Sequence, residues 1–213
     1  YLQETDRSVR QEAWERVAGR RLEVSEECDS QFDDLKNLRI QIAANAGFGD
    51  YRDFKHVAKG RFDYQPEDCF KFHEAVEKVV MPAYNEMLAD RRSKLGLNTL
   101  RPWDTSVDPD GLEPLRPFTE VEEMVAKTKG IFDQVDGELA TGFQKMRDGQ
   151  LLDLANRKGK APGGYQSSLP EARLPFIFMN SVGLQRDVET LLHEAGHAFH
   201  TLAAHGEDIH EYQ

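Results

Sequence analysis

The chain has 213 residues and carries 27 Lys and Arg against 38 Asp and Glu, which gives a formal net charge of −11. This acidity argues against a nucleic-acid partner, because such binding depends on cationic side chains that contact phosphates. No apolar run approaches the ~20 residues that a membrane-spanning helix needs, and no signal peptide is evident, so we expect a cytoplasmic protein with no membrane partner.

The N-terminal part of the sequence has the apolar periodicity of helices. Residues 6–46 lack proline and repeat apolar side chains at helical spacing, which predicts one long helix or two in tandem. A glycine-rich turn follows, and then a short helix is expected at 51–58. A further helix is expected over 66–94, with a kink at Pro82, because proline removes a backbone donor inside a helix.

A proline-rich segment at 97–117 separates these helices from the next helical stretch. We expect this segment to be an ordered loop that could include a short strand. Thr119 and Glu122 have the spacing of a capping box, which predicts a helix start. That helix should continue to about Met146, with a break at Gly130. We therefore assign residues 1–150 to a helical region.

From Leu151 the periodicity changes to that of short strands. Strands are expected at 152–155 and 173–179, with turn residues at 159–164 between them. Residues 151–213 are therefore expected to form a β element followed by one more helix. Two roles are open for the strands: an unpaired edge that binds an extended peptide, or a structural hairpin that only shields the helix.

The helix predicted at 187–204 contains the pattern H-E-x-x-H, formed by His193, Glu194 and His197. Two histidines four residues apart lie one above the other on a helix, so both imidazoles can reach one metal ion. Glu194 lies beside them, where it can act as the general base on a zinc-bound water. Chance alone produces such a pattern in a chain of this size at roughly the few-percent level.

The pattern needs a helix with one face buried and the other open, and the flanking residues predict one. The apolar face is formed by Leu184, Val188, Leu191, Ala195, Ala198 and Leu202. The opposite face carries both motif histidines together with Arg186, Thr190, His200 and Ala204.

Several stretches of the sequence resemble segments of a known protein family. The most specific are P-F-I-F-M-N at 175–180, D-V-E-T-L-L at 187–192 and H-E-A-G-H-A-F at 193–199; weaker matches are L-R-P-W-D at 100–104, G-G-Y at 163–165 and D-R-S-V-R at 6–10. Together they resemble the oligoendopeptidase F branch of the thimet-oligopeptidase-like zinc peptidases. The resemblance spans most of the chain and looks like the central part of such a peptidase, cut on both sides.

This resemblance implies a mainly α fold: a long-helix peptidase architecture with a small β element next to a zincin-type H-E-x-x-H helix. It implies that His193 and His197 bind zinc and that Glu194 is catalytic. Substrate backbone would lie along an edge strand formed by Pro175, Phe176, Ile177, Phe178, Met179 and Asn180, and Gly163, Gly164 and Tyr165 would also bind substrate. The family's third zinc ligand, a glutamate, and its transition-state-stabilising groups are expected after Gln213.

We therefore expect a zinc-dependent metallopeptidase that hydrolyses short peptides, with these 213 residues alone being inactive. Two alternatives are open. One is a non-catalytic helical scaffold, which a missing downstream acidic ligand would favour. The other is a structural zinc-binding module, in which a fourth protein ligand replaces the water. The sequence leaves the oligomeric state and the cleavage specificity open.

Overall fold

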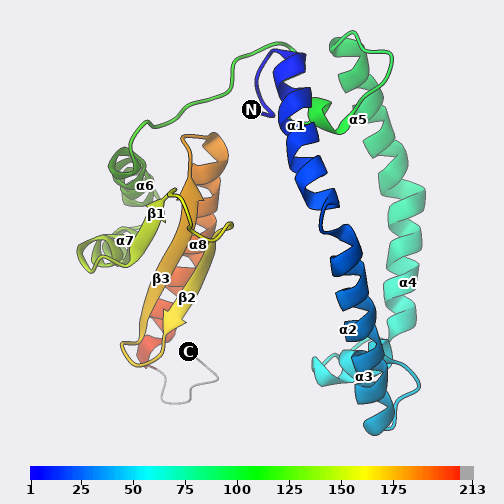
Figure 1. Cartoon of the computed structure of the whole chain (residues 1–213). Helices are drawn as coiled ribbons and strands as arrows, with labels where there is room; N and C mark the ends of the chain where they lie inside the picture. The colour runs from blue at the N-terminus through cyan, green and yellow to red at the C-terminus, as the bar shows by residue number, and fades with distance from the viewer. Residues whose placement is uncertain (207–213) are drawn as a thin grey trace. The chain divides into compact units, whose positions relative to one another are not determined.

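The computed structural model describes residues 1–206, and its internal contacts divide the chain into two compact units, Tyr1–Glu113 and Pro114–Gln213 (Figure 1). Each unit is described here by itself. Within the described residues, no helix has the length and apolarity needed to span a membrane.

The first unit is built from helices, a π-helical turn and a 3-10 turn. Its elements are α1 (Arg7–Leu22), α2 (Ser25–Asn45), α3 (Tyr51–Ala58), α4 (Pro66–Ala75), η1 (Val76–Val80), α5 (Met81–Lys94) and η2 (Pro102–Asp104). The prediction of two helices in tandem over residues 6–46 is confirmed, as is the short helix at 51–58. In Figure 1, α1 and α2 follow one another along one arm, and α4 and α5 form a second arm beyond α3.

The long helix predicted over 66–94 is interrupted where proline requires it. Pro82 has no backbone N–H, so the carbonyl four residues earlier cannot receive its usual helical hydrogen bond. The chain adapts by widening into the π-helical turn η1 immediately before α5, in which Pro82 occupies the first turn. The segment 97–117 contains the short 3-10 turn η2 and no strand. The short strand that the sequence allowed in this loop is therefore not formed.

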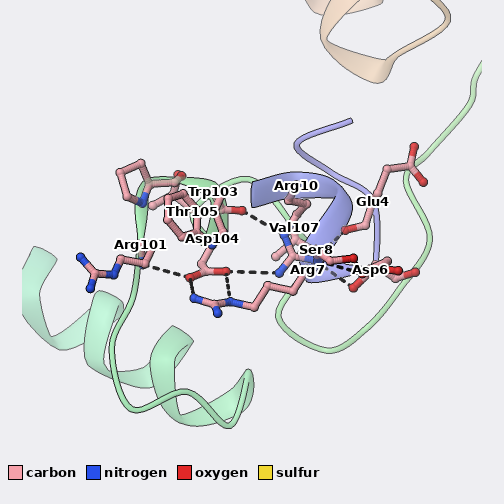
Figure 2. Close-up of polar contacts among 12 residues, drawn as sticks. Glu4, Asp6, Arg7, Ser8, Arg10, Arg101, Trp103, Asp104, Thr105 and Val107 are labelled. Carbon is pink, nitrogen blue, oxygen red and sulfur yellow. Dashed lines mark hydrogen bonds and ion pairs between the residues drawn. The ribbon is translucent and has the colours of Figure 1, made fainter. Parts of the chain in front are cut away.

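Asp104 is the polar centre of this unit (Figure 2). Its side chain is fully buried and accepts two hydrogen bonds from the Arg7 guanidinium, both 2.9 Å long. The buried Arg10 guanidinium donates to the same carboxylate at 3.3 Å and to the Trp103 carbonyl at 3.0 Å. The Arg101 amide donates a further bond at 2.9 Å. These bonds tie the start of α1 to η2.

Folding favours the ionised form of Asp104. Burial by itself would raise the pKa of this carboxyl, but hydrogen bonds from Arg7, the Arg101 amide and Arg10 hold the pKa below its usual value. A carboxyl whose pKa is lowered by folding stabilises the protein above its unfolded pKa of about 3.9. That contribution is lost as the pH falls through the folded-state pKa.

The second unit combines three helices with a three-stranded sheet. Its elements are α6 (Val121–Val135), α7 (Gly137–Asp148), β1 (Leu152–Ala155), β2 (Tyr165–Leu169), β3 (Leu174–Ser181), α8 (Gln185–Ala203) and η3 (Ala204–Gly206). The strand predicted at 152–155 is confirmed, and the one predicted at 173–179 is found one residue later as β3. The strand β2 was not predicted.

Two details of the helices differ from the sequence-based predictions. The capping carboxylate at the start of α6 is Glu123, which accepts a bond from the Thr119 amide at 2.8 Å; the expected partner was Glu122. The helix break lies at Asp136, whose side chain caps α7 by accepting from the Glu138 amide at 2.7 Å. Gly130 lies inside α6, because a single glycine weakens a helix without ending it.

The hydrophobic core lies in this unit. Phe132 of α6 contacts Phe143 of α7 and Phe199 of α8, with ring centroids 5.3 and 4.9 Å apart. The helices α6 and α7 therefore share a core with α8. The sequence-based division after residue 150 groups α6 and α7 with the N-terminal helices, whereas the contact-based units separate after Glu113.

The sheet has the order β1-β3-β2, with β1 parallel and β2 antiparallel to β3. Strand β3 is therefore the central strand and is paired on both sides. The expectation that 175–180 form an unpaired edge is wrong, because the missed strand β2 occupies that side. As far as residue 206, the free edges of this sheet belong to β1 and β2.

We predict that Asp104→Asn opens the first unit locally. The substitution leaves Arg10 buried without its counterion, which costs about 3–5 kcal/mol when one partner of a buried pair is removed. Hydrogen exchange should accelerate by roughly 10²–10⁴-fold in α1 and around η2. The exposed residue Asp29 of α2 provides the control, and Asp29→Asn should leave exchange unchanged. Equal exchange in both variants would show that Asp104 does not hold α1 in place.

Candidate metal centre and the strand beside it

The start of α8 is fixed by the buried carboxylate of Asp187. This carboxylate accepts hydrogen bonds from the Val182 amide at 2.7 Å and the Leu184 amide at 2.9 Å. Gly183 lies between them with a φ of +89°, a conformation that L side chains rarely adopt. The turn that leads from β3 into α8 is thus held by a side chain of the helix itself.

One face of α8 is buried, as predicted. Leu191, Ala195 and Ala198 are fully buried, and Val188 packs against the same core. Gly142 of α7 allows close approach to α8 here, since a Cβ at this position would lie 3.2 Å from the Leu202 side chain.

The other face of α8 carries His193 and His197, both of which are exposed. Their Nε2 atoms lie 3.2 Å apart and their rings are almost perpendicular, with an interplanar angle of 85°. Two nitrogens bound to one tetrahedral zinc at 2.0–2.1 Å would be separated by about 3.3 Å. The two imidazoles therefore already have the spacing that a shared zinc ion requires.

Glu194 lies between the histidine face and the core. It is 9% exposed, so most of the residue is shielded from solvent. Within residues 1–206 its carboxylate has no hydrogen bond or ion pair to another side chain or to the backbone. A carboxylate placed one residue from a metal ligand and not engaged by these residues can accept a proton from a group bound at the histidines.

The described residues offer two candidate metal ligands at this site, His193 and His197. No group of three or more His, Cys, Asp or Glu side chains with metal-binding geometry occurs between residues 1 and 206. Glu207 and Glu211, which were not assigned as ligands from the sequence, lie outside the described residues. A catalytic zinc site uses three protein ligands, so the third would have to come from elsewhere.

Strand β2 runs along the histidine face of α8. Gly164, just before β2, lies against Thr190, one turn before His193; a Cβ on Gly164 would be 3.2 Å from the Thr190 methyl. At the other end, Thr201, one turn after His197, lies within hydrogen-bond distance of Gln166 and Ser168, 3.1 Å in each case. Both ends of the histidine stripe are therefore in contact with β2 or the residue before it.

The substrate-binding residues proposed from the sequence divide into two groups. On β3, Pro175, Ile177 and Met179 are buried, whereas Phe176, Phe178 and Asn180 are half-buried. The second group is near the free edge: Gly163 and Gly164 lead into β2, and Tyr165 begins it with half of its surface exposed. Within residues 1–206, only the second group lies at a strand that has one unpaired edge.

Sequence reasoning missed four residues that organise this region: Lys160, Gln166, Ser168 and Thr201. Strand β2 is only five residues long and has serine at both 167 and 168, so its sequence carries little period-2 signal. Thr201 could have been found from its position, four residues after His197 on the same helix face.

The chain is similar to known proteins over nearly all of its length. The model of peptidase family M3 matches residues 1–211 of the chain. Among curated protein sequences, none matches the chain.

Among solved structures, a Bacillus anthracis protein whose name assigns it to oligoendopeptidase F superposes with a TM-score of 0.91 at 31% identity, covering 100% of this chain and 39% of that protein. The structure of PZ peptidase A with an inhibitor superposes with a TM-score of 0.92 at 31% identity, covering 100% and 38%. This chain therefore spans less than two fifths of the length of either.

We predict that Gly164→Ala separates β2 from α8. The added Cβ would lie 3.2 Å from both Met179 Cβ and Thr190 Cγ2, so strand or helix must shift. Such overpacking costs about 1–3 kcal/mol and should appear as faster hydrogen exchange in 165–169. As the control, Gly130→Ala in α6 meets nothing within 4 Å and should be neutral or slightly stabilising. If the two variants are equally stable, the close approach at Gly164 is unimportant.

Proposed function

Because this chain belongs to peptidase family M3, we propose that it carries the zinc-binding and general-base part of a metallopeptidase that hydrolyses short peptides. The observation that carries the proposal is the 3.2 Å separation of the His193 and His197 Nε2 atoms, with Glu194 adjacent to them on α8. The similarity to structures named oligoendopeptidase F and PZ peptidase supports an oligopeptide as the substrate.

The two histidines would hold the metal through their Nε2 lone pairs, which requires both imidazoles to be neutral. A zinc ion bound there would lower the pKa of a coordinated water and polarise the carbonyl of the scissile peptide bond. Since the other face of α8 is packed against the core, the backbone positions of the two histidines are fixed one helical turn apart.

Glu194 would act as the general base and then as the general acid. Its carboxylate would accept the proton of the attacking water and pass that proton to the amide nitrogen of the leaving group. Burial of Glu194 against the core limits the positions that its carboxylate can take. A fixed carboxylate loses less entropy when it reaches the geometry of proton transfer.

The peptide would bind along the outer edge of β2, with Gly163, Gly164 and Tyr165 at its start. Strand β3 is paired on both sides, whereas β2 has one neighbour in the sheet and runs along the histidine face. A substrate in extended conformation can add to such an edge through main-chain hydrogen bonds, which makes binding tolerant of sequence. Its carbonyl groups would then pass beside the two histidines.

The remaining parts of the site would come from other segments of the same protein. The described residues offer two ligands, and the matched structures are more than twice as long as this chain. A third ligand and the groups that stabilise the charge of the transition state would complete the site.

We predict that Glu194→Gln in the full-length protein retains zinc but loses turnover. Glu194 is not a ligand, so metal content should remain near one per chain, whereas loss of a general base should reduce kcat by about 10²–10⁴-fold. Glu189→Gln, on an exposed position of the same helix, is the control and should be fully active. Near-normal hydrolysis by Glu194→Gln with zinc bound would remove this residue from the mechanism.

We also predict that residues 1–213 alone bind zinc weakly and cleave no peptide at a useful rate, because two histidines lack the third ligand. Zinc titration and a fluorogenic-peptide assay test this directly, with the full-length protein as the positive control. Tight zinc binding with chelator-sensitive cleavage would place the third ligand within the 213 residues, with Glu207 and Glu211 the first candidates. Tight binding without cleavage in the full-length protein would favour a structural zinc module.

A further inference from the structure

A buried lysine connects the strands behind the proposed peptide edge. The Lys160 side chain is 1% exposed. Its ammonium donates to the carbonyls of Asp153, Ala155 and Met179 at 2.9, 2.9 and 2.6 Å, and to the Asp153 carboxylate at 3.1 Å. The same ammonium lies 4.5 Å from the centroid of the Phe178 ring. The proposed hydrolysis makes no use of this group.

The irregular pairing of β1 with β3 explains why a lysine is needed there. Asp153 pairs with Phe178, but Ala155 pairs with Ser181, so the register shifts by one residue between these two pairs. Such a bulge leaves carbonyls without their ladder partners. Buried carbonyls without donors are costly, and the three N–H groups of the Lys160 ammonium supply donors to both strands.

The charge of Lys160 is also compensated. Hydrogen bonds from Arg157 and, to a smaller extent, from Lys160 lower the pKa of Asp153 to about 2, although burial by itself would raise it. This carboxylate is therefore ionised at neutral pH and can balance the buried ammonium.

The residues around Lys160 also determine where β2 begins. Asn180, which follows Met179 on β3, donates to the carbonyls of Ala161 and Gly163 at 2.8 and 3.1 Å. Lys160 and Asn180 thus hold the connection between β1 and β2 against the end of β3. In addition, the Phe178 ring that contacts the Lys160 ammonium is stacked on the Tyr165 ring, with centroids 5.0 Å apart.

We propose that Lys160 is a positioning residue for peptide binding: it anchors the 156–164 connection, and through Phe178 and this connection it fixes the edge of β2 beside the histidine face of α8. This inference rests on the proposed function. A loosened edge would have to be ordered each time a peptide binds, and that ordering cost weakens binding. The cost should grow with the length of peptide paired to the edge and should be small for a substrate that reaches only the metal site.

The test compares a long and a short substrate in the zinc-loaded full-length protein. The long substrate is a fluorogenic peptide that extends well beyond the cleaved bond on both sides, and the short one is truncated to the residues next to that bond. Lys160→Met keeps an unbranched side chain of similar length but removes the charge and the donors. Lys158→Met, at an exposed position two residues earlier, is the matched control.

We expect Lys160→Met to raise KM for the long peptide on the order of tenfold, with kcat, zinc content and cleavage of the short peptide within about twofold of the parent protein. Lys158→Met should behave as the parent. Asn180→Ala, which removes the second anchor of the same connection and retains Lys160, should also raise KM for the long peptide. If Lys160→Met fails to fold, the KM of Asn180→Ala for the long peptide tests the role of the same connection.

An equal loss on both substrates, or an unchanged KM for the long peptide in Lys160→Met and Asn180→Ala, would overturn the positioning role while leaving the proposed peptidase intact. Absence of chelator-sensitive cleavage in the parent protein would instead overturn the proposed function and, with it, this inference.

Discussion

Helix α8 has one face packed into the hydrophobic core and the opposite face open, and the positions of the other elements in the second unit follow from this division. The core side brings α6 and α7 against Ala195, Ala198 and Phe199. The open side presents His193 and His197 at a spacing that suits one metal ion. Because Asp187 caps the helix from within, the helix cannot rotate about its axis without losing both the cap and the core packing.

The sheet has a supporting role that complements the helix. Its central strand β3 is mostly buried and connects β1, β2 and α8, while β2 is exposed along one edge. The contacts of β2 with Thr190 and Thr201 keep this edge parallel to the histidine stripe. Under the proposed function, a peptide paired to this edge would pass beside the two histidines through main-chain contacts.

Much of this organisation could be predicted from the sequence. The helix carrying the H-E-x-x-H pattern was predictable because apolar and polar residues segregate to opposite faces at a 3.6-residue period. The interruption of the helix before Pro82 follows from the missing N–H of proline. The resemblance of the segments at 175–180 and 187–199 indicated the family, and the match of residues 1–211 to peptidase family M3 confirms it.

The sheet order was not predictable, because β2 is short and polar and its partners are chosen by tertiary contacts. As a result, the edge was assigned to the apolar β3, whose alternating burial is typical of a strand packed on one side. The cluster around Lys160 was also hidden, since its partners are mainly carbonyl groups, which leave no trace in the sequence. The Asp104 cluster joins residues more than 90 positions apart, a distance over which spacing carries no information.

The central claim is that His193 and His197 together bind one zinc ion. X-ray absorption at the zinc edge of the full-length protein measures this directly, because the outer ring atoms of an imidazole scatter distinctly beyond the Zn–N shell at about 2.0 Å. The parent protein should show two imidazoles per zinc, and His193→Ala or His197→Ala should lower zinc occupancy and leave one imidazole in any metal that remains bound. An unchanged zinc content and two imidazoles in both variants would contradict the account, because the metal would then be held elsewhere.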